Sequence, residues 1–230
     1  MKISRFAALG GAVGVLTLTL ALSAPALGAK SAVSVRVEGV KRTLLPTTAA
    51  HAESGSVTKA GTPAGICPGS SGAGYFDSAT HHHWDGTYSS GLGVEVTTVL
   101  GETHTFSAKG FYWGIWVDNR FATSGLCDLK LKAGDQLLLA PAPGSGTTYP
   151  IILTAPTHAK MGTPFAVKAA YFKTSHGAAK TLARVKITDA GSLTNGRGVA
   201  TVTAAKAGKL TLVASLKGYI RAEATVTVAR

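Results

Sequence analysis

Catalytic signatures and acidic residues are scarce in this chain of 230 residues. The chain has eleven acidic residues and 23 lysines and arginines, which gives a formal net charge of +12. No Gly-x-Ser-x-Gly, His-Glu-x-x-His or paired carboxylate motif accompanies the run Glu102-Thr103-His104, so nothing in the sequence supports a hydrolase. We therefore expect a protein that is not an enzyme and that needs no cofactor.

Long apolar runs are absent after the first 29 residues. Two basic residues precede an uncharged apolar run over residues 6–22, and small residues follow at 24–29. This order predicts a secretory signal peptide over residues 1–29. The alternative, a retained membrane anchor, needs about 20 continuous apolar residues. We expect a secreted, extracellular protein without a transmembrane segment, either free or associated with the cell envelope.

Cysteine is limited to Cys67 and Cys127. In an exported chain without a third thiol, two cysteines most simply form one disulfide, so we expect Cys67 to pair with Cys127. The alternative is a nucleophilic or metal-binding thiolate. That role would need an activating histidine nearby or a Cys-x-x-Cys pair, and neither flanks these residues.

Composition changes in the middle of the chain. Residues 140–148 are rich in Pro, Gly, Ser and Thr, a composition that does not hold a core and commonly separates domains. The sequence therefore predicts a first domain at 30–140, a linker at 141–150 and a second domain at 151–230.

Positive charge is concentrated in the second half. Residues 30–146 hold nine basic and nine acidic residues, whereas residues 147–230 hold twelve basic and two acidic ones, a net of +10. We expect partners that are anionic cell-envelope polymers or another surface protein. No recognition helix, paired aromatic motif or zinc finger favours nucleic acid. The alternative is that these lysines only solvate exposed strand faces.

Short alternating or β-branched segments fill residues 151–230, separated by glycine-containing turns. We expect strands at 151–154, 165–170, 183–188, 198–204, 209–215 and 221–228. The spacing predicts an antiparallel sandwich. Here GVATVT, AGKLTLVA and GYIR resemble the C-terminal half of bacterial immunoglobulin-like surface domains. The resemblance implies a spacer or adhesive unit.

The first domain is predicted to mix strands with one helix. We expect strands at 32–37, 42–46, 111–117 and 136–140. A helix is expected over 72–80, because Ala73, Phe76 and either Ala79 or Thr80 share one helical face after a serine cap.

The order strand, strand, helix, strand, hairpin, last strand resembles a β-grasp. Residues similar to the transcobalamin-like C-terminal domain family of bacterial exported proteins are those at 35–39, 43–46, 99–102, 112–113, 116–117, 125–127 and 131–135, with the Cys67 segment and Trp84. That family takes its name from a domain that closes over a corrinoid. The expected fold is mainly β: a β-grasp-like α+β domain followed by an immunoglobulin-like β-sandwich.

Alternation along residues 111–117 divides the aromatic residues into two faces. The core face is predicted to carry Phe111, Trp113, Ile115 and Val117. The other face carries Tyr112 and Trp116, whose rings could form a partly exposed platform for a sugar or another planar ligand. With Trp84 they are the candidate ligand-binding residues of an alternative function, binding of a small corrinoid or glycan. The competing expectation is that the loop at 53–65 or the linker covers these rings.

Histidines gather at one point before Trp84. The run His81-His82-His83, with Asp85, could capture Zn, Ni or Cu through imidazole and carboxylate ligands. These four residues are weak metal candidates, because adjacent side chains diverge. The alternative is an exposed loop without a metal.

Overall fold

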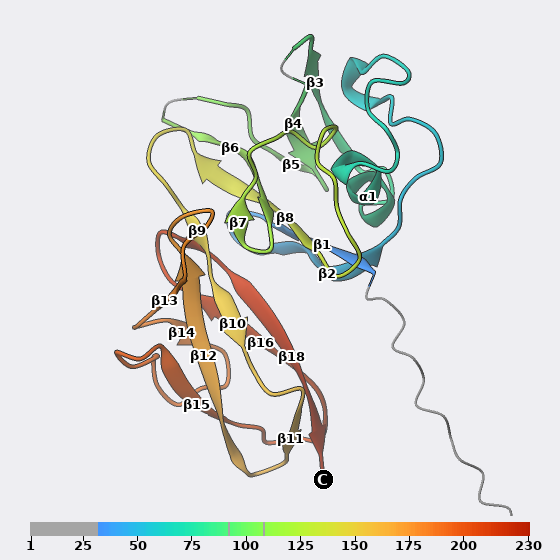
Figure 1. Ribbon diagram of the computed structural model, residues 1–230. Coiled ribbons are helices and arrows are strands. Elements are labelled where there is room, and N and C mark those ends of the chain that lie inside the picture. The colour runs from blue at the N-terminus through green and yellow to red at the C-terminus, as the bar shows by residue number, and fades with distance from the viewer. Residues whose placement is uncertain (1–31, 92, 108) are drawn as a thin grey trace, which may run out of the picture.

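The computed structural model describes residues 32–91, 93–107 and 109–230 and shows a mainly β chain folded into two lobes (Figure 1). The N-terminal lobe comprises residues 32–143, and the C-terminal lobe comprises residues 149–230. The expected signal peptide lies outside the described residues. No helix in the described part of the chain is long and apolar enough to cross a membrane.

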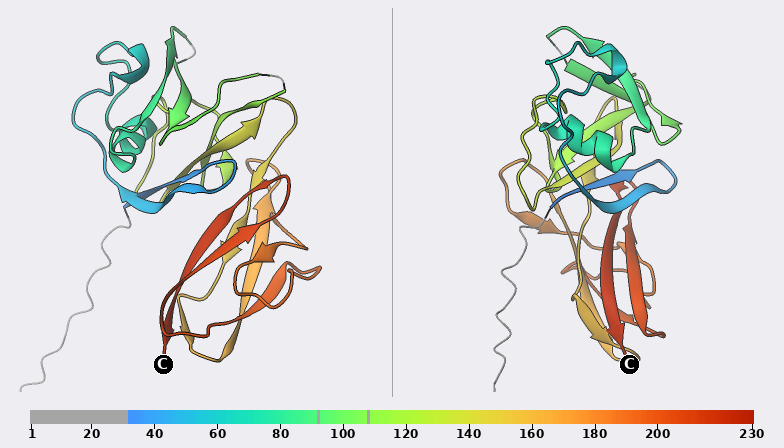
Figure 2. Two further views of the ribbon diagram at one scale, coloured as in Figure 1. Left: turned by 180° about the vertical axis from the view of Figure 1, so that it is seen from behind. Right: turned by 90° about the vertical axis from the view of Figure 1, so that its right-hand side faces the viewer.

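A five-stranded sheet forms the base of the N-terminal lobe. Its order is β2 (Thr43–Ala50), β1 (Val33–Glu38), β8 (Gln136–Pro143), β6 (Phe111–Val117) and β7 (Arg120–Phe121); β1 and β8 are parallel and the other pairs antiparallel. One face is covered by helix α1 (Gly72–Ala79) and by a smaller sheet of β3 (Trp84–Ser89), β4 (Gly93–Val99) and β5 (Glu102–Thr103) (Figure 2). A 3-10 turn, η1 (Lys59–Gly61), precedes α1.

Strand β8 is buried on both of its faces. Leu137 and Leu139 pack with α1 in the core of the N-terminal lobe, whereas Leu138, Ala140 and Ala142 form a separate cluster that includes Ile220 of the C-terminal lobe. Because side chains alternate along a strand, one strand contributes to two cores. The five-stranded sheet is therefore also the platform on which the second lobe rests.

The predicted helix is present. Ala73, Phe76 and Ala79 are buried on its inner face, as the periodicity indicates. Ser71 occupies the N-cap position, but its hydroxyl donates to the Pro68 carbonyl at 2.6 Å and caps no helical N–H, so the expected side-chain cap is wrong.

The expected disulfide between Cys67 and Cys127 is confirmed. It joins the segment before α1 to the segment between β7 and β8, across 60 positions of sequence. Both cysteines are buried in the core of the N-terminal lobe.

Removing this bond is expected to destabilise the protein by about 2 to 4 kcal/mol, because the unfolded chain regains the freedom that the closed loop denied it. Urea unfolding with and without a thiol reductant measures the effect. Cys67→Ser combined with Cys127→Ser is the matched control, since its unfolding midpoint should be low and insensitive to reductant. Equal midpoints for the oxidised and reduced protein would contradict the prediction.

The C-terminal lobe consists of two facing sheets around a core that contains no cysteine. One sheet holds β10 (Ile152–Thr154), β12 (Pro164–Phe172), β13 (Ala179–Thr181) and β15 (Val199–Thr203); the other holds β11 (His158–Lys160), β14 (Lys186–Ile187), β16 (Gly208–Ser215) and β18 (Ala222–Ala229). Each of the six expected segments contains a strand. Strands β11 and β13 were not expected, because their few residues are mostly exposed and carry no apolar alternation.

The segment expected to be a linker is largely structured. Strand β8 continues to Pro143, and β9 (Tyr149–Pro150) pairs with β17 (Tyr219–Ile220). Pro141 and Pro143 can lie in β8 because its pairing with β1 ends at Leu139, so beyond that point the strand has a neighbour only in β6. Five residues, 144–148, remain between the named strands of the two lobes.

Candidate functional site between the two lobes

The aromatic strand β6 faces two different environments. Trp113 is buried in the core of the N-terminal lobe, with Ile115 and Val117 packed against that core, as predicted. Phe111 was expected there too, but 44% of it is exposed, so this expectation is wrong. The residue lies at the first position of the strand, opposite Pro143, where the sheet ends at the boundary between the lobes.

Trp116 is not part of an open platform. It is 2% exposed and belongs to the cluster of Leu138, Ala140, Ala142 and Ile220, with Tyr112 packed against it. The C-terminal lobe provides the cover through Ile220, whereas the sequence suggested the 53–65 loop or the linker. No pattern near Trp116 could have shown this, because Ile220 lies far along the chain.

Tyr112 and Trp116 nevertheless border a cavity of about 290 Å³ between the lobes. Phe121 of the N-terminal lobe and Phe172 and Lys173 of the C-terminal lobe also line it. The sequence thus correctly placed these two rings together, but the cavity depends on the neighbouring lobe.

Trp84, the third candidate, lies in the core of the N-terminal lobe. It is 4% exposed, packs against Phe76 with ring centroids 5.5 Å apart, and donates from Nε1 to Asp77 Oδ1 at 2.6 Å. Its ring faces are therefore taken up by packing, and it does not join Tyr112 and Trp116.

The histidine run contributes one residue to a possible cation-binding group. Ligand atoms of Glu53, Asp77 and His82 lie within 4.8 Å of one another, and His82 Nδ1 is 2.7 Å from Asp77 Oδ2. Two carboxylates and one imidazole could hold a divalent ion. The expected set was different, since the structure does not bring Asp85 to this group; its carboxylate accepts from the N–H of Gly86.

The Glu102-Thr103-His104 run forms a pair with a structural role. His104 Nε2 is 2.7 Å from Glu102 Oε1, which also accepts from the Val40 N–H at 2.8 Å. The imidazole packs edge-on against Trp113, with centroids 5.1 Å apart. These contacts hold β5 against the turn between β1 and β2.

A buried ionic network joins the lobes. Glu38, 1% exposed, accepts from Arg36 of its own strand at 2.9 Å and from Nε of Arg221 in the C-terminal lobe at 3.1 Å. Arg36 also donates to the Arg221 carbonyl at 2.8 Å, and the Thr43 hydroxyl lies within 2.9 Å of Glu223. Burial raises the pKa of the Glu38 carboxyl, a shift that both guanidinium groups oppose, and burial lowers the pKa of Arg36.

A second contact between the lobes lies at β7. The Arg120 guanidinium donates to the carbonyls of Thr174, Ser175 and Gly177 in the loop between β12 and β13, and it lies 3.5 Å from the ring centroid of Phe172. With the Glu38 network, this contact fixes the lobes at two separated points.

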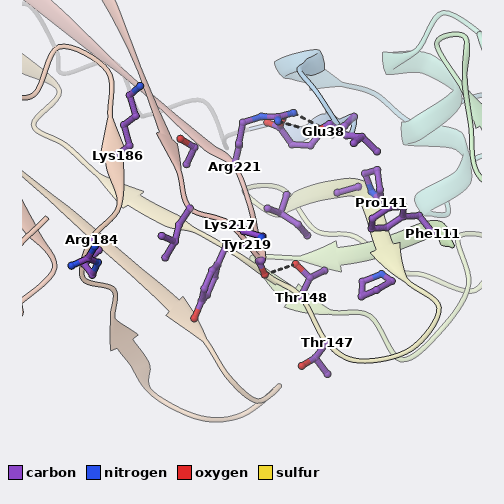
Figure 3. Close-up of a pocket in the computed structure, with 18 residues that line it drawn as sticks. Glu38, Phe111, Pro141, Thr147, Thr148, Arg184, Lys186, Lys217, Tyr219 and Arg221 are labelled. Atoms are coloured by element: carbon purple, nitrogen blue, oxygen red, sulfur yellow. Dashed lines mark hydrogen bonds and ion pairs between the residues drawn. The ribbon is translucent and has the colours of Figure 1, made fainter. Parts of the chain in front are cut away.

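A cleft of about 690 Å³ opens between the lobes beside the Glu38 network (Figure 3). The wall from the C-terminal lobe carries Arg184, Lys186 and Lys217. The opposite wall includes Val40, Phe111, Pro141 and Pro143, and the linker contributes Thr147 and Thr148. This cleft is larger than the cavity beside Tyr112 and Trp116. Arg184, Lys186 and Lys217 were included in the net charge of residues 147–230, but no binding role was predicted for any of them from the sequence.

Comparison with family models, with curated proteins and with solved structures found no match for this chain. The geometry and charge of the two lobes are therefore the only indications of function.

Proposed function

We propose that this is a secreted, non-enzymatic protein of the cell surface, whose basic C-terminal lobe retains the N-terminal lobe near an anionic envelope polymer. One observation carries the proposal. Of the twelve basic residues in 147–230, eleven are exposed, and none of the eleven is in an ion pair within the described part of the chain. The remaining one, Arg221, belongs to the Glu38 network.

These cations are available to an external partner. Lys186 lines the cleft, whereas Lys160 and Lys209 pair with Ala229 and Thr227 close to the C-terminus. The C-terminus lies at the end of the sandwich far from the N-terminal lobe (Figure 1). A net of +10 on one lobe produces a field that concentrates polyanions and weakens with salt. Binding of this kind needs many dispersed charges and no catalytic group.

In this proposal the C-terminal lobe is an immunoglobulin-like spacer and the N-terminal lobe a β-grasp module similar to the transcobalamin-like C-terminal domain. The support for the β-grasp is a sheet with its single helix on one face, together with the matching residues. Two facing sheets, antiparallel except for the parallel pair of β11 and β18, support the sandwich. The envelope location accords with the disulfide.

Retention of the full mature chain on immobilised polyphosphate tests the proposal. Lys160→Gln, Lys206→Gln and Lys209→Gln together, called the distal variant, remove three exposed charges from the far end of the C-terminal lobe. We expect its affinity to fall about tenfold at low salt, because each exposed contact contributes a few tenths of a kcal/mol or more. The salt dependence of elution should become shallower.

Lys109→Gln, Lys130→Gln and Lys132→Gln together are the matched control, since they remove three exposed charges from the N-terminal lobe. This control should elute close to the unmodified protein. Equal loss in both variants would mean that net charge alone governs retention. The absence of any salt-sensitive retention would end the proposal.

A further inference from the structure

We propose that the 690 Å³ cleft is a binding site for a small amphipathic anion, a molecule with one anionic group and one apolar body. This inference is independent of envelope retention, because it concerns one cleft and a small molecule. The cleft volume lies within the range of about 300 to 1,000 Å³ that is usual for small-ligand sites.

The two walls of the cleft differ in character. Arg184, Lys186 and Lys217 are exposed, form no ion pair within the described residues, and all come from the C-terminal lobe. The single acidic residue lining the cleft, Glu38, is buried and bonded to Arg36 and Arg221. The field inside the cleft is therefore positive along one wall only.

The opposite wall exposes apolar surface that a core would normally take up. Phe111 is 44% exposed and Val40 is 49% exposed, although Phe111 begins a strand whose Trp113 and Trp116 are buried. With Pro141 and Pro143 they form the apolar part of the lining of the same cleft; Figure 3 shows Phe111 and Pro141 on the side away from Arg184 and Lys186. An apolar body against this wall would place an anionic group near Arg184, Lys186 and Lys217.

The backbone that carries Arg184 and Lys186 is held in place before any ligand arrives. The buried Thr194 hydroxyl accepts from the Val185 N–H and donates to the Leu182 carbonyl, and the Arg184 N–H donates to the Thr194 carbonyl. Lys186 lies on β14, which pairs with β16. The spacing between the walls is set by the Glu38 network and the Arg120 contact. Such preorganisation reduces the entropic cost of binding.

Fluorescence titration with 8-anilinonaphthalene-1-sulfonate, an amphipathic anion, tests the site, with N-phenyl-1-naphthylamine as the uncharged analogue. We expect one anion per chain and about tenfold weaker binding of the analogue. The cleft variant carries Arg184→Gln, Lys186→Gln and Lys217→Gln together. It should bind the anion about tenfold more weakly and bind the analogue as the unmodified protein does. Phe111→Ala should weaken both probes.

The distal variant is the matched control, with the same charge change outside the cleft. It should bind the anion within about twofold of the unmodified protein, although its retention on polyphosphate falls. Equal weakening by the distal and cleft variants, or no binding of the anion, would overturn the site. The same holds if Lys173→Gln, in the cavity beside Tyr112 and Trp116, weakens binding while the cleft variant does not. Thermal unfolding of each variant verifies the fold.

Discussion

Trp116→Ala is expected to lower the free energy of unfolding by about 3 to 5 kcal/mol. Trp116 is 2% exposed and fills the space between Leu138 and Ala142 of the sheet and Ile220 of the C-terminal lobe. Removing the indole leaves a void that the two fixed lobes can only partly close. A β-carbon on Gly114 would lie 2.5 Å from the same ring, so that glycine also serves this packing.

Urea unfolding of Trp116→Ala measures the loss. Phe121→Ala is the matched control, because Phe121 meets Trp116 edge-on at 5.3 Å yet is 51% exposed, so its loss should cost less than about 1 kcal/mol. A Trp116→Ala variant of normal stability that has lost binding of a sugar or corrinoid would instead favour a ligand platform. The expected result makes Trp116 a packing residue of the interface.

Glu38→Ala is expected to cost about 3 to 5 kcal/mol, because it leaves Arg36 buried without its counter-ion. Arg221 would also lose its partner across the interface. The variant should therefore lower the unfolding midpoint and weaken the coupling between the lobes. Thermal unfolding, followed by the combined emission of Trp84, Trp113 and Trp116, measures the midpoint, and two separate transitions would show weakened coupling.

The triple variant Arg36→Met, Glu38→Leu and Arg221→Met removes the whole ionic network. It separates the net contribution of the network to stability from the cost of leaving a buried charge without a partner. Replacing a whole buried ionic group with apolar residues of similar size is often neutral or stabilising. The triple variant should thus recover most of the stability lost in Glu38→Ala. If Glu38→Ala were as stable as the unmodified protein, the network would not hold the lobes together.

Local patterns in the sequence predicted the helix, several of the strands and the disulfide. Residues close together in sequence were enough to predict the helix with Phe76 inside and the strand with Trp113 inside. The Cys67–Cys127 bond was predictable because the chain has only two cysteines. Short strands such as β11 and β13 were missed because three mostly exposed residues are too few to show a periodicity.

The interface could not be predicted, because it depends on residues far apart in the chain. Alternation in β1 assigns Arg36 and Glu38 to the face away from the core, which for charged residues normally means solvent. The C-terminal lobe buries that face through Arg221, 183 positions from Glu38. The C-terminal lobe also covers Trp116 of β6, while Phe111 at the start of β6 stays exposed at the cleft. Sequence alternation therefore identified the two faces but not what covers each.

Strand β8 limits how freely this protein can be divided. Its Leu138, Ala140 and Ala142 face the C-terminal lobe, so a fragment ending at Pro143 would present them with Trp116 as a contiguous apolar surface. Such a fragment would tend to self-associate. The halves are thus poor candidates for recombination as interchangeable modules, and a fusion that transplants either half needs a substitute for the missing neighbour.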